Sequence, residues 1–120
     1  MKLKDTGKTK EELKEMYDTY FHETFKRFDF VADQGEGSYV IDETGKKYLD
    51  FMAGIAVNSA GHCNKNVVSA IIDQCQSMMH ASNYCYTVPQ AMAAELICQS
   101  IGFEKIYFQN SGAEANEVMM

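Results

Sequence analysis

The sequence predicts a mixed α/β chain, and three patterns support this class. Apolar residues recur at helical spacing behind Thr9, Asn64 and Thr87, each of which can start a helix. Two apolar runs within residues 39–51 enclose an Asp-x-x-Gly turn, which is typical of a β-hairpin. A short β-rich run at 105–108 leads through a glycine-containing turn into a last helix. The chain of 120 residues allows one domain at most.

The composition is that of a packed globular chain. Of its residues, 46% are apolar and 23% are charged, which argues against disordered and fibrous classes. Eleven Lys and Arg against 17 Asp and Glu give a formal net charge of −6. With Arg27 as its only arginine, the chain offers no basic stripe, so we discount nucleic acids and anionic membranes as partners.

No segment suits a membrane or secretory role. The longest apolar run, residues 51–57, is far shorter than the roughly 20 residues that cross a bilayer. The first fifteen residues carry lysines but no apolar block behind them, unlike a secretory signal. We therefore expect a cytoplasmic protein.

The cysteines are expected to be reduced and buried, because they are widely spaced and include no CxxC pair. They stand at Cys63, Cys75, Cys85 and Cys98. A zinc site can be drawn from Cys63 and Cys85 with His62 and His80, but the spacing matches no metal template. No metal site is predicted.

The first helix begins at a capping box formed by Thr9 and Glu12. Its apolar stripe consists of Leu13, Met16, Tyr17, Tyr20 and Phe21. We expect this helix to end between Phe25 and Phe28. Its stripe should dock on the body of the protein or on another chain.

The hairpin is expected to have strands at 39–41 and 48–51. Asp42 can hydrogen-bond the turn backbone, and Gly45 can adopt the positive φ that a bulged loop needs. The next residues, 51–62, are small, apolar and punctuated by glycine. They suit either a buried loop or a segment that packs against backbone and lines a pocket.

Two further helices follow. Asn64 can cap a helix that runs to about Met79 with a wide apolar face, whose methionines and cysteine we interpret as packing residues. The second is expected at 88–101, with Pro89 in its first turn and Gly102 closing it. Its start carries Thr87 and Gln90, a second capping pattern.

The turn after the β-rich run is the only short segment whose residues suggest a chemical function. Gln109–Ala113 lead from a strand into a helix, so several N–H groups can point at one spot and bind an anion. Alternatively, Ser111 and Glu114 form a capping box that satisfies those groups without a ligand. Glu114 and Glu117 would also repel a phosphate unless they point away. Both interpretations stay open on these residues alone.

The chain stops a few residues into an apolar helix that ends in two methionines. This ending predicts the N-terminal part of a longer protein. The apolar faces of the helices at 65–79 and 88–101 should then be left uncovered.

Three blocks of sequence, in order and in register, carry a family resemblance. They are GEGSYVIDETGKKYLDFMAGIAVNSAGHC at 35–63, HASNYCYTVPQ at 80–90 and FQNSGAEANE at 108–117. From about Phe25 onward the chain resembles class III, ornithine-aminotransferase-like, pyridoxal-phosphate enzymes, and most of all their branch that acts on N-acetylornithine. Where the family usually continues GHC with His-Pro, Asn64 and Lys65 stand here, which affects only the local helix start.

The resemblance implies a fold-type-I transferase that works as a homodimer with active sites at the subunit interface. Residues 1–60 would form an N-terminal helix and hairpin segment, and 61–120 the beginning of the pyridoxal-phosphate-binding large domain. By the same resemblance, a cofactor-phosphate site falls on Ser111, Gly112 and Ala113, with two backbone amides as the main donors.

The resemblance also suggests substrate and subunit contacts. Gly54–Asn58 would form a wall of the substrate pocket, with Ile55 as the substrate-binding residue. Ser82 and Asn83 would lie at the dimer interface.

The implied activity moves an amino group from N-acetylornithine to 2-oxoglutarate in arginine biosynthesis. Alternative donors are ornithine, 4-aminobutyrate and diaminobutyrate, and a non-catalytic dimerising or regulatory module is a further alternative. The family's Schiff-base lysine would lie downstream of Met120. We therefore assign no catalytic residue, and expect no transamination by these 120 residues alone.

Overall fold

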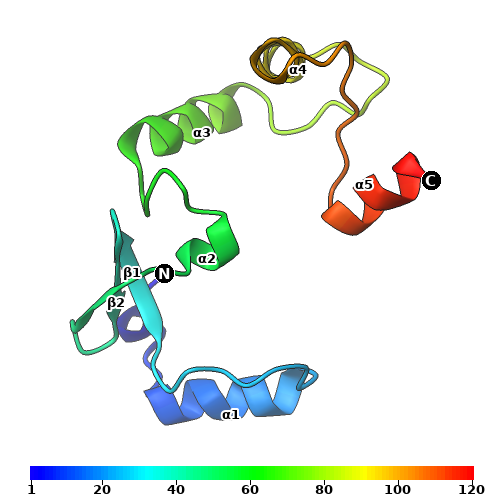
Figure 1. Ribbon diagram of the computed structural model, residues 1–120. Helices are drawn as coiled ribbons and strands as arrows, with labels where there is room; N and C mark the ends of the chain where they lie inside the picture. The colour runs from blue at the N-terminus through cyan, green and yellow to red at the C-terminus, as the bar shows by residue number, and fades with distance from the viewer. The chain divides into compact units, whose positions relative to one another are not determined.

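The computed structural model describes residues 1–120, which divide into two compact units, residues 1–76 and residues 77–120. Each unit is described by itself. Figure 1 shows the elements in chain order: η1 (Leu3–Thr6), α1 (Lys10–Tyr20), β1 (Ala32–Glu36), β2 (Tyr39–Asp42), β3 (Lys47–Leu49), α2 (Ala53–Ala56), α3 (Lys65–Ser77), α4 (Val88–Ile101) and α5 (Gly112–Met119). None of the helices has both the length and the apolar character needed to cross a membrane.

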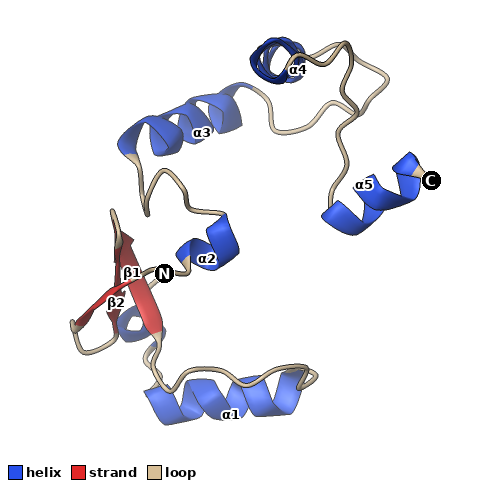
Figure 2. Ribbon diagram, viewed as in Figure 1, coloured by secondary structure: helices blue, strands red, loops and turns tan.

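The strands of the first unit form one antiparallel sheet in the order β1-β2-β3 (Figure 2). The predicted hairpin is confirmed, with Val40 opposite Tyr48. Strand β1 was not predicted, because its sequence ADQGE has no apolar alternation. It pairs with β2 through Gly35 opposite Val40, so the sheet has three strands where the sequence predicted two.

Asp42 organises the hairpin turn. Its Oδ1 accepts hydrogen bonds from the N–H groups of Thr44 and Lys46, both at 2.9 Å, and from the Thr44 hydroxyl at 2.6 Å. Its Oδ2 accepts one from the Tyr48 hydroxyl at 2.9 Å. Gly45 has the expected positive φ, 90°. At 5% exposure Asp42 is the only buried residue, and no hydrophobic residue is buried.

Helix α1 begins as predicted and ends early. The Thr9 Oγ1 accepts from the N–H of Glu12 at 3.1 Å, and the Glu12 carboxylate accepts from the N–H of Thr9 at 2.8 Å. The expected end at residues 25–28 is wrong, because the backbone is already extended at Phe21. The Phe21 ring stacks on Tyr17 with centroids 4.6 Å apart, and the Arg27 guanidinium lies 4.7 Å above the Tyr17 ring. The residues after the helix therefore fold back over it.

Helix α3 starts where predicted, directly after Asn64, whose side chain caps it. The Asn64 Oδ1 accepts from the N–H groups of Asn66 at 3.0 Å and Val67 at 3.4 Å. The helix ends at Ser77, two residues short of the expected Met79. Its apolar face is exposed at Val67, Val68, Ile71 and Ile72, and that of α4 at Val88, Met92, Leu96 and Ile101, as expected for uncovered faces.

The cysteines differ from the expectation of burial. All four are free, three are exposed and only Cys98 is half-buried. A cysteine on a helix face is buried only when a second layer of structure covers that face. Residues 1–120 contain no buried hydrophobic side chain, so no such layer is present among them. The burial prediction is therefore wrong for this chain.

The second unit contains α4 and α5. Gly102 closes α4 in the left-handed conformation, φ 74°, and donates its N–H to the Cys98 carbonyl at 2.9 Å. Thr87 stands at the N-cap, but its hydroxyl contacts the Gln90 amide oxygen at 3.5 Å and caps no backbone group. Residues 105–108, predicted as a β-rich run, form no strand. A strand needs a hydrogen-bonded neighbour, and the only sheet of the chain consists of β1, β2 and β3, none of which pairs with residues 105–108.

The Asp42 carboxylate should make the hairpin turn sensitive to acid. The Thr44 hydroxyl, more than any other contact, lowers the pKa of Asp42 from 3.8 to about 2. A carboxyl whose pKa is lower in the folded state stabilises the fold at pH values above its unfolded pKa. This contribution is lost as the pH falls through its folded pKa. We expect the amide protection of Thr44 and Lys46, measured by hydrogen exchange on the full-length gene product, to hold to about pH 4 and to fall toward about pH 2.

Asp42→Asn is the matched control, because the amide keeps an acceptor oxygen but does not titrate. Its turn should be less protected at neutral pH and show no specific loss between about pH 4 and 2. The amides of α1 serve as the reference for global unfolding. Wild-type turn protection that stays flat through this range would contradict the prediction.

Candidate functional site

The start of α5 has the geometry that the sequence predicts. Ser111 is the extended N-cap residue, with φ −146° and ψ 160°, and its Oγ accepts from the N–H of Glu114 at 3.2 Å. Its carbonyl accepts from the N–H of Ala115 at 3.0 Å. The hydroxyl therefore satisfies only one of the free N–H groups of the first turn.

Two donors at this turn remain available for a ligand. The N–H groups of Gly112 and Ala113 have no hydrogen-bond partner within the chain. Apart from its chain neighbours and its own helix backbone, no heavy atom lies within 4 Å of the position that a Cβ would take at Gly112, so this side of the turn is open. Adjacent free N–H groups at the positive end of a helix dipole form an anion-binding cradle. These residues fit the phosphate of a cofactor.

Glu114 limits what Ser111 can donate. The Ser111 hydroxyl donates to the Glu114 Oε2 at 2.9 Å. The second half of a capping box, in which the Ser111 N–H would donate to the Glu114 carboxylate, is not formed. The two alternatives from the sequence thus coexist, with a partial cap beside two free backbone donors. The carboxylate does not point away from the turn. A phosphate that used the hydroxyl would have to displace it.

Ile55 lies on a turn of unusual backbone conformation. The four residues of α2 all have positive φ: Ala53 47°, Gly54 65°, Ile55 60° and Ala56 62°. For residues with a Cβ this left-handed conformation costs roughly 1–2 kcal/mol each. The Ile55 side chain is 84% exposed. The sequence left open a buried loop or a pocket-lining segment here. The buried loop is wrong, because Phe51, Ile55 and Val57 are exposed, and the left-handed turn was not predicted.

Two polar residues that flank the turn contact each other. His62 Nε2 lies 2.7 Å from Asp50 Oδ2, and both side chains are largely shielded, with 20% and 14% exposure. The sequence offered His62 only as a possible metal ligand and did not single out Asp50. A carboxylate and an imidazole twelve residues apart give no sequence signal, because only the fold of the intervening turn brings them together.

The predicted interface residues lie on the loop before α4. Ser82 has a positive φ of 57°, and its Oγ lies 3.5 Å from the N–H of Tyr84. The neighbouring Tyr84 and Tyr86 are fully exposed. Ser82, Asn83 and the cradle residues belong to the unit 77–120, whereas Ile55 belongs to the unit 1–76.

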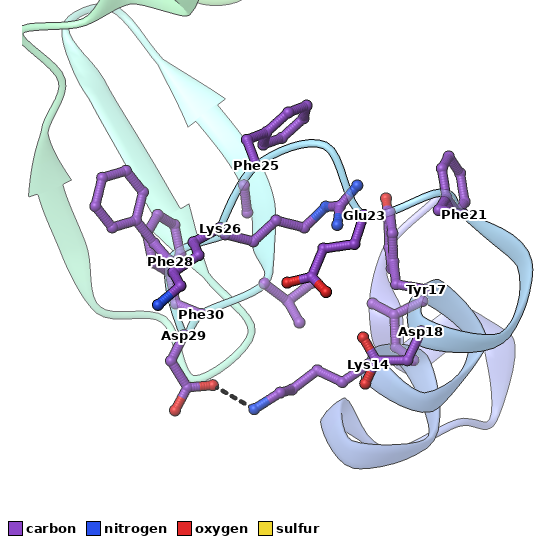
Figure 3. A pocket seen from close by; sticks show the side chains of 14 residues that line it. Lys14, Tyr17, Asp18, Phe21, Glu23, Phe25, Lys26, Phe28, Asp29 and Phe30 are labelled. Atoms are coloured by element: carbon purple, nitrogen blue, oxygen red, sulfur yellow. Dashed lines mark hydrogen bonds and ion pairs between the residues drawn. The ribbon is translucent and has the colours of Figure 1, made fainter.

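A pocket of about 630 Å³ lies beside α1, lined in part by Leu13, Tyr17 and Phe21 of the predicted apolar stripe. Tyr17 projects from α1, Phe21 stands directly after its last residue, and Phe25 comes from the residues that follow (Figure 3). The Arg27 guanidinium lies within 5.6 Å of all three ring centroids. This pocket is where the chain folds back over α1, and it holds none of the predicted site residues.

No group of three or more His, Cys, Asp or Glu side chains gathers to hold a metal ion.

The comparisons with known proteins agree on one family. The family model for aminotransferase class-III matches residues 20–120. Acetylornithine aminotransferase from Methanocaldococcus jannaschii is 46% identical over 98 residues, covering 82% of this chain and 25% of that protein. The one from Clostridium acetobutylicum is 40% identical over 102 residues, covering 85% and 26%. The chain thus spans about a quarter of the length of the curated relatives it matches.

Solved structures give the same result. Acetylornithine aminotransferase from Elizabethkingia anophelis superposes with a TM-score of 0.87 and 30% identity, over 93% of this chain and 29% of that one. Ornithine aminotransferase from Plasmodium yoelii gives 0.86 and 28%, over 93% and 30%. These neighbours confirm the α/β fold class, the N-terminal portion of a fold-type-I transferase, and they depend on pyridoxal phosphate. The chain therefore belongs to the class-III aminotransferases, a family of pyridoxal-phosphate-dependent enzymes.

Proposed function

We propose that this chain forms the N-terminal part of a pyridoxal-phosphate-dependent aminotransferase that moves an amino group from N-acetylornithine to 2-oxoglutarate, a step of arginine biosynthesis. The observation that carries the proposal is the identity of 40–46% to acetylornithine aminotransferases over more than four-fifths of the chain. Residues 1–60 form the N-terminal segment and 61–120 the start of the cofactor-binding large domain. The protein works in the cytoplasm as a homodimer.

The cradle at α5 holds the cofactor phosphate. Gly112 and Ala113 donate their free N–H groups to it, and Ser111 adds its hydroxyl once Glu114 has released it. When bound, pyridoxal phosphate supplies the electron sink that lets an amino group leave one substrate and enter another. The chain's own contribution is to fix the phosphate end and so orient the cofactor.

The remaining assignments concern substrate and subunit contacts. The exposed Ile55 side chain forms part of the wall of the substrate pocket and contacts the amino donor. Ser82 and Asn83, on an exposed loop with positive φ at Ser82, contact the partner subunit near its cofactor.

Ornithine is the second candidate donor. The likeness to an ornithine aminotransferase, with a TM-score of 0.86 against 0.87 for an acetylornithine aminotransferase, supports it. The two donors differ by an acetyl group on the α-amine, which changes that nitrogen from a cation to a neutral amide. A pocket that accepts one should therefore discriminate against the other.

Steady-state kinetics on the full-length gene product decide between the donors. We expect transfer to 2-oxoglutarate with kcat/KM for N-acetylornithine at least about tenfold above that for ornithine, 4-aminobutyrate or diaminobutyrate. A preference for ornithine would replace the first candidate with the second. A cofactor-loaded protein that transfers from none of the donors would overturn the proposal and favour a non-catalytic module.

The cradle predicts a specific difference between two substitutions at Gly112. Pro fits the first position of a helix after an extended residue but lacks the N–H, whereas Ala keeps it. A hydrogen bond to a charged group contributes about 1.5–3 kcal/mol. We therefore expect Gly112→Pro to weaken pyridoxal-phosphate affinity about tenfold or more, and Gly112→Ala to stay within about threefold of wild type, measured by equilibrium titration of the apoprotein.

Ser111→Ala completes the series. The hydroxyl already has Glu114 as a partner, so its removal should cost less affinity than Gly112→Pro does. Equal affinities for the proline and alanine variants at Gly112 would show that its N–H does not contact the phosphate.

A further inference from the structure

The left-handed turn α2 cannot hold its own conformation, because three of its four residues carry a Cβ. Within it, the N–H of Ala56 donates to the Met52 carbonyl at 3.0 Å, and the N–H of Asn58 donates to the Ala53 carbonyl at 2.8 Å. These bonds close the turn but do not select its hand. The selection has to come from contacts at its ends.

Asp50 holds the N-terminal end of the turn. Its Oδ1 accepts the N–H groups of Met52 at 3.0 Å and Ala53 at 2.9 Å. Its own N–H donates to the Ser38 carbonyl at 2.8 Å, which ties it to the sheet. One carboxylate oxygen thus fixes the two peptide groups that enter the left-handed segment.

His62 holds the other oxygen of that carboxylate. With the proton on Nε2, the ring donates to Asp50 Oδ2 across 2.7 Å. This bond, more than any other contact, lowers the pKa of Asp50. The His62 backbone is itself fixed, because it exchanges two hydrogen bonds with Gly37, at 2.7 and 3.0 Å.

Gly35 provides the space that the imidazole occupies. A Cβ at this position would lie 2.7 Å from both Cβ and Cγ of His62, a distance that real Cβ atoms do not show. Gly35 has an ordinary negative φ, so its need for glycine comes from this contact and not from its backbone. Strand β1, the histidine and the carboxylate therefore form one continuous support.

We infer that Asp50 and His62, with Gly35 beneath the imidazole, are positioning residues that fix the left-handed turn Ala53–Ala56 and so aim Ile55 at the amino donor. The inference deepens the proposed function, because it rests on Ile55 as a substrate wall. Neither Asp50 nor His62 touches substrate in this role. Their effect is on where Ile55 stands.

The experiment compares four variants of the full-length gene product. Asp50→Ala removes the support, and Gly35→Ala displaces His62 while leaving Asp50 intact, which keeps the test decisive should Asp50→Ala not fold. Asp50→Asn is the conservative rescue, because its amide oxygen can keep both turn N–H groups and its Nδ2 can donate to an unprotonated Nε2 of His62. Asp18→Ala, an exposed residue of α1, is the matched control.

Hydrogen exchange over residues 52–58 is the readout that does not depend on activity. We expect exchange to rise about tenfold or more in Asp50→Ala and Gly35→Ala, and to stay near wild type in Asp50→Asn and Asp18→Ala. Unchanged exchange in both disrupting variants would overturn the inference, whether or not the protein transaminates.

Kinetics test the link to the donor. We expect the KM for the amino donor to rise about tenfold in the disrupting variants, with kcat, the KM for the 2-oxo acid and pyridoxal-phosphate affinity each within about threefold of wild type. A loosened turn with an unchanged donor KM would overturn the positioning role. A wild-type protein without transaminase activity would instead overturn the proposed function, and the exchange result would still decide whether Asp50 and His62 hold the turn.

Discussion

The buried carboxylate of Asp42 is the contact on which the folded part of residues 1–76 depends. It accepts four hydrogen bonds from Thr44, Lys46 and Tyr48, and these fix the turn between β2 and β3. That turn sets the register between β2 and β3, and Asp50 directly follows β3. Strand β1, which carries Gly35, pairs with β2 across a separate two-residue turn, Gly37–Ser38. Hydrogen bonds between polar groups therefore stabilise this sheet, whereas an apolar core stabilises most small sheets.

What could be predicted from the sequence is local. Thr9, Asn64 and Gly102 mark helix ends correctly because a cap involves residues within one turn of the chain. Other features depend on what packs beside a segment, which no pattern within that segment encodes. They are the end of α1, the absence of a strand at 105–108 and the exposure of Cys75. The site divides in the same way. The turn at Ser111–Ala113 was predictable from its own residues, whereas the support of Ile55 joins Gly35, Asp50 and His62 across the sheet.

The two candidate regions also differ in how they are built. The cradle at α5 is made of backbone groups, so it is insensitive to side-chain identity except where the N–H itself is lost. The Glu114 carboxylate accepts a hydrogen bond from the Ser111 hydroxyl, and Lys105 is the only lysine or arginine among residues 77–120. Phosphate binding at the cradle, as proposed, would therefore depend on its geometry and the helix dipole, with little help from cationic side chains of its own unit. The α2 turn has the opposite design, since a chain of side-chain contacts supports its backbone.

The left-handed backbone at Ile55 has a consequence for how a family of this kind could change its substrates. At this φ the steric penalty is smallest for Gly, Asn and Asp and largest for β-branched residues such as Ile itself, so most replacements of Ile55 add no backbone strain. The conformation is determined by neighbours, and the side chain itself is exposed. Mutation at this single position can therefore alter the size and polarity of the proposed wall while the backbone stays where it is. Such a turn separates the evolution of selectivity from the evolution of the fold.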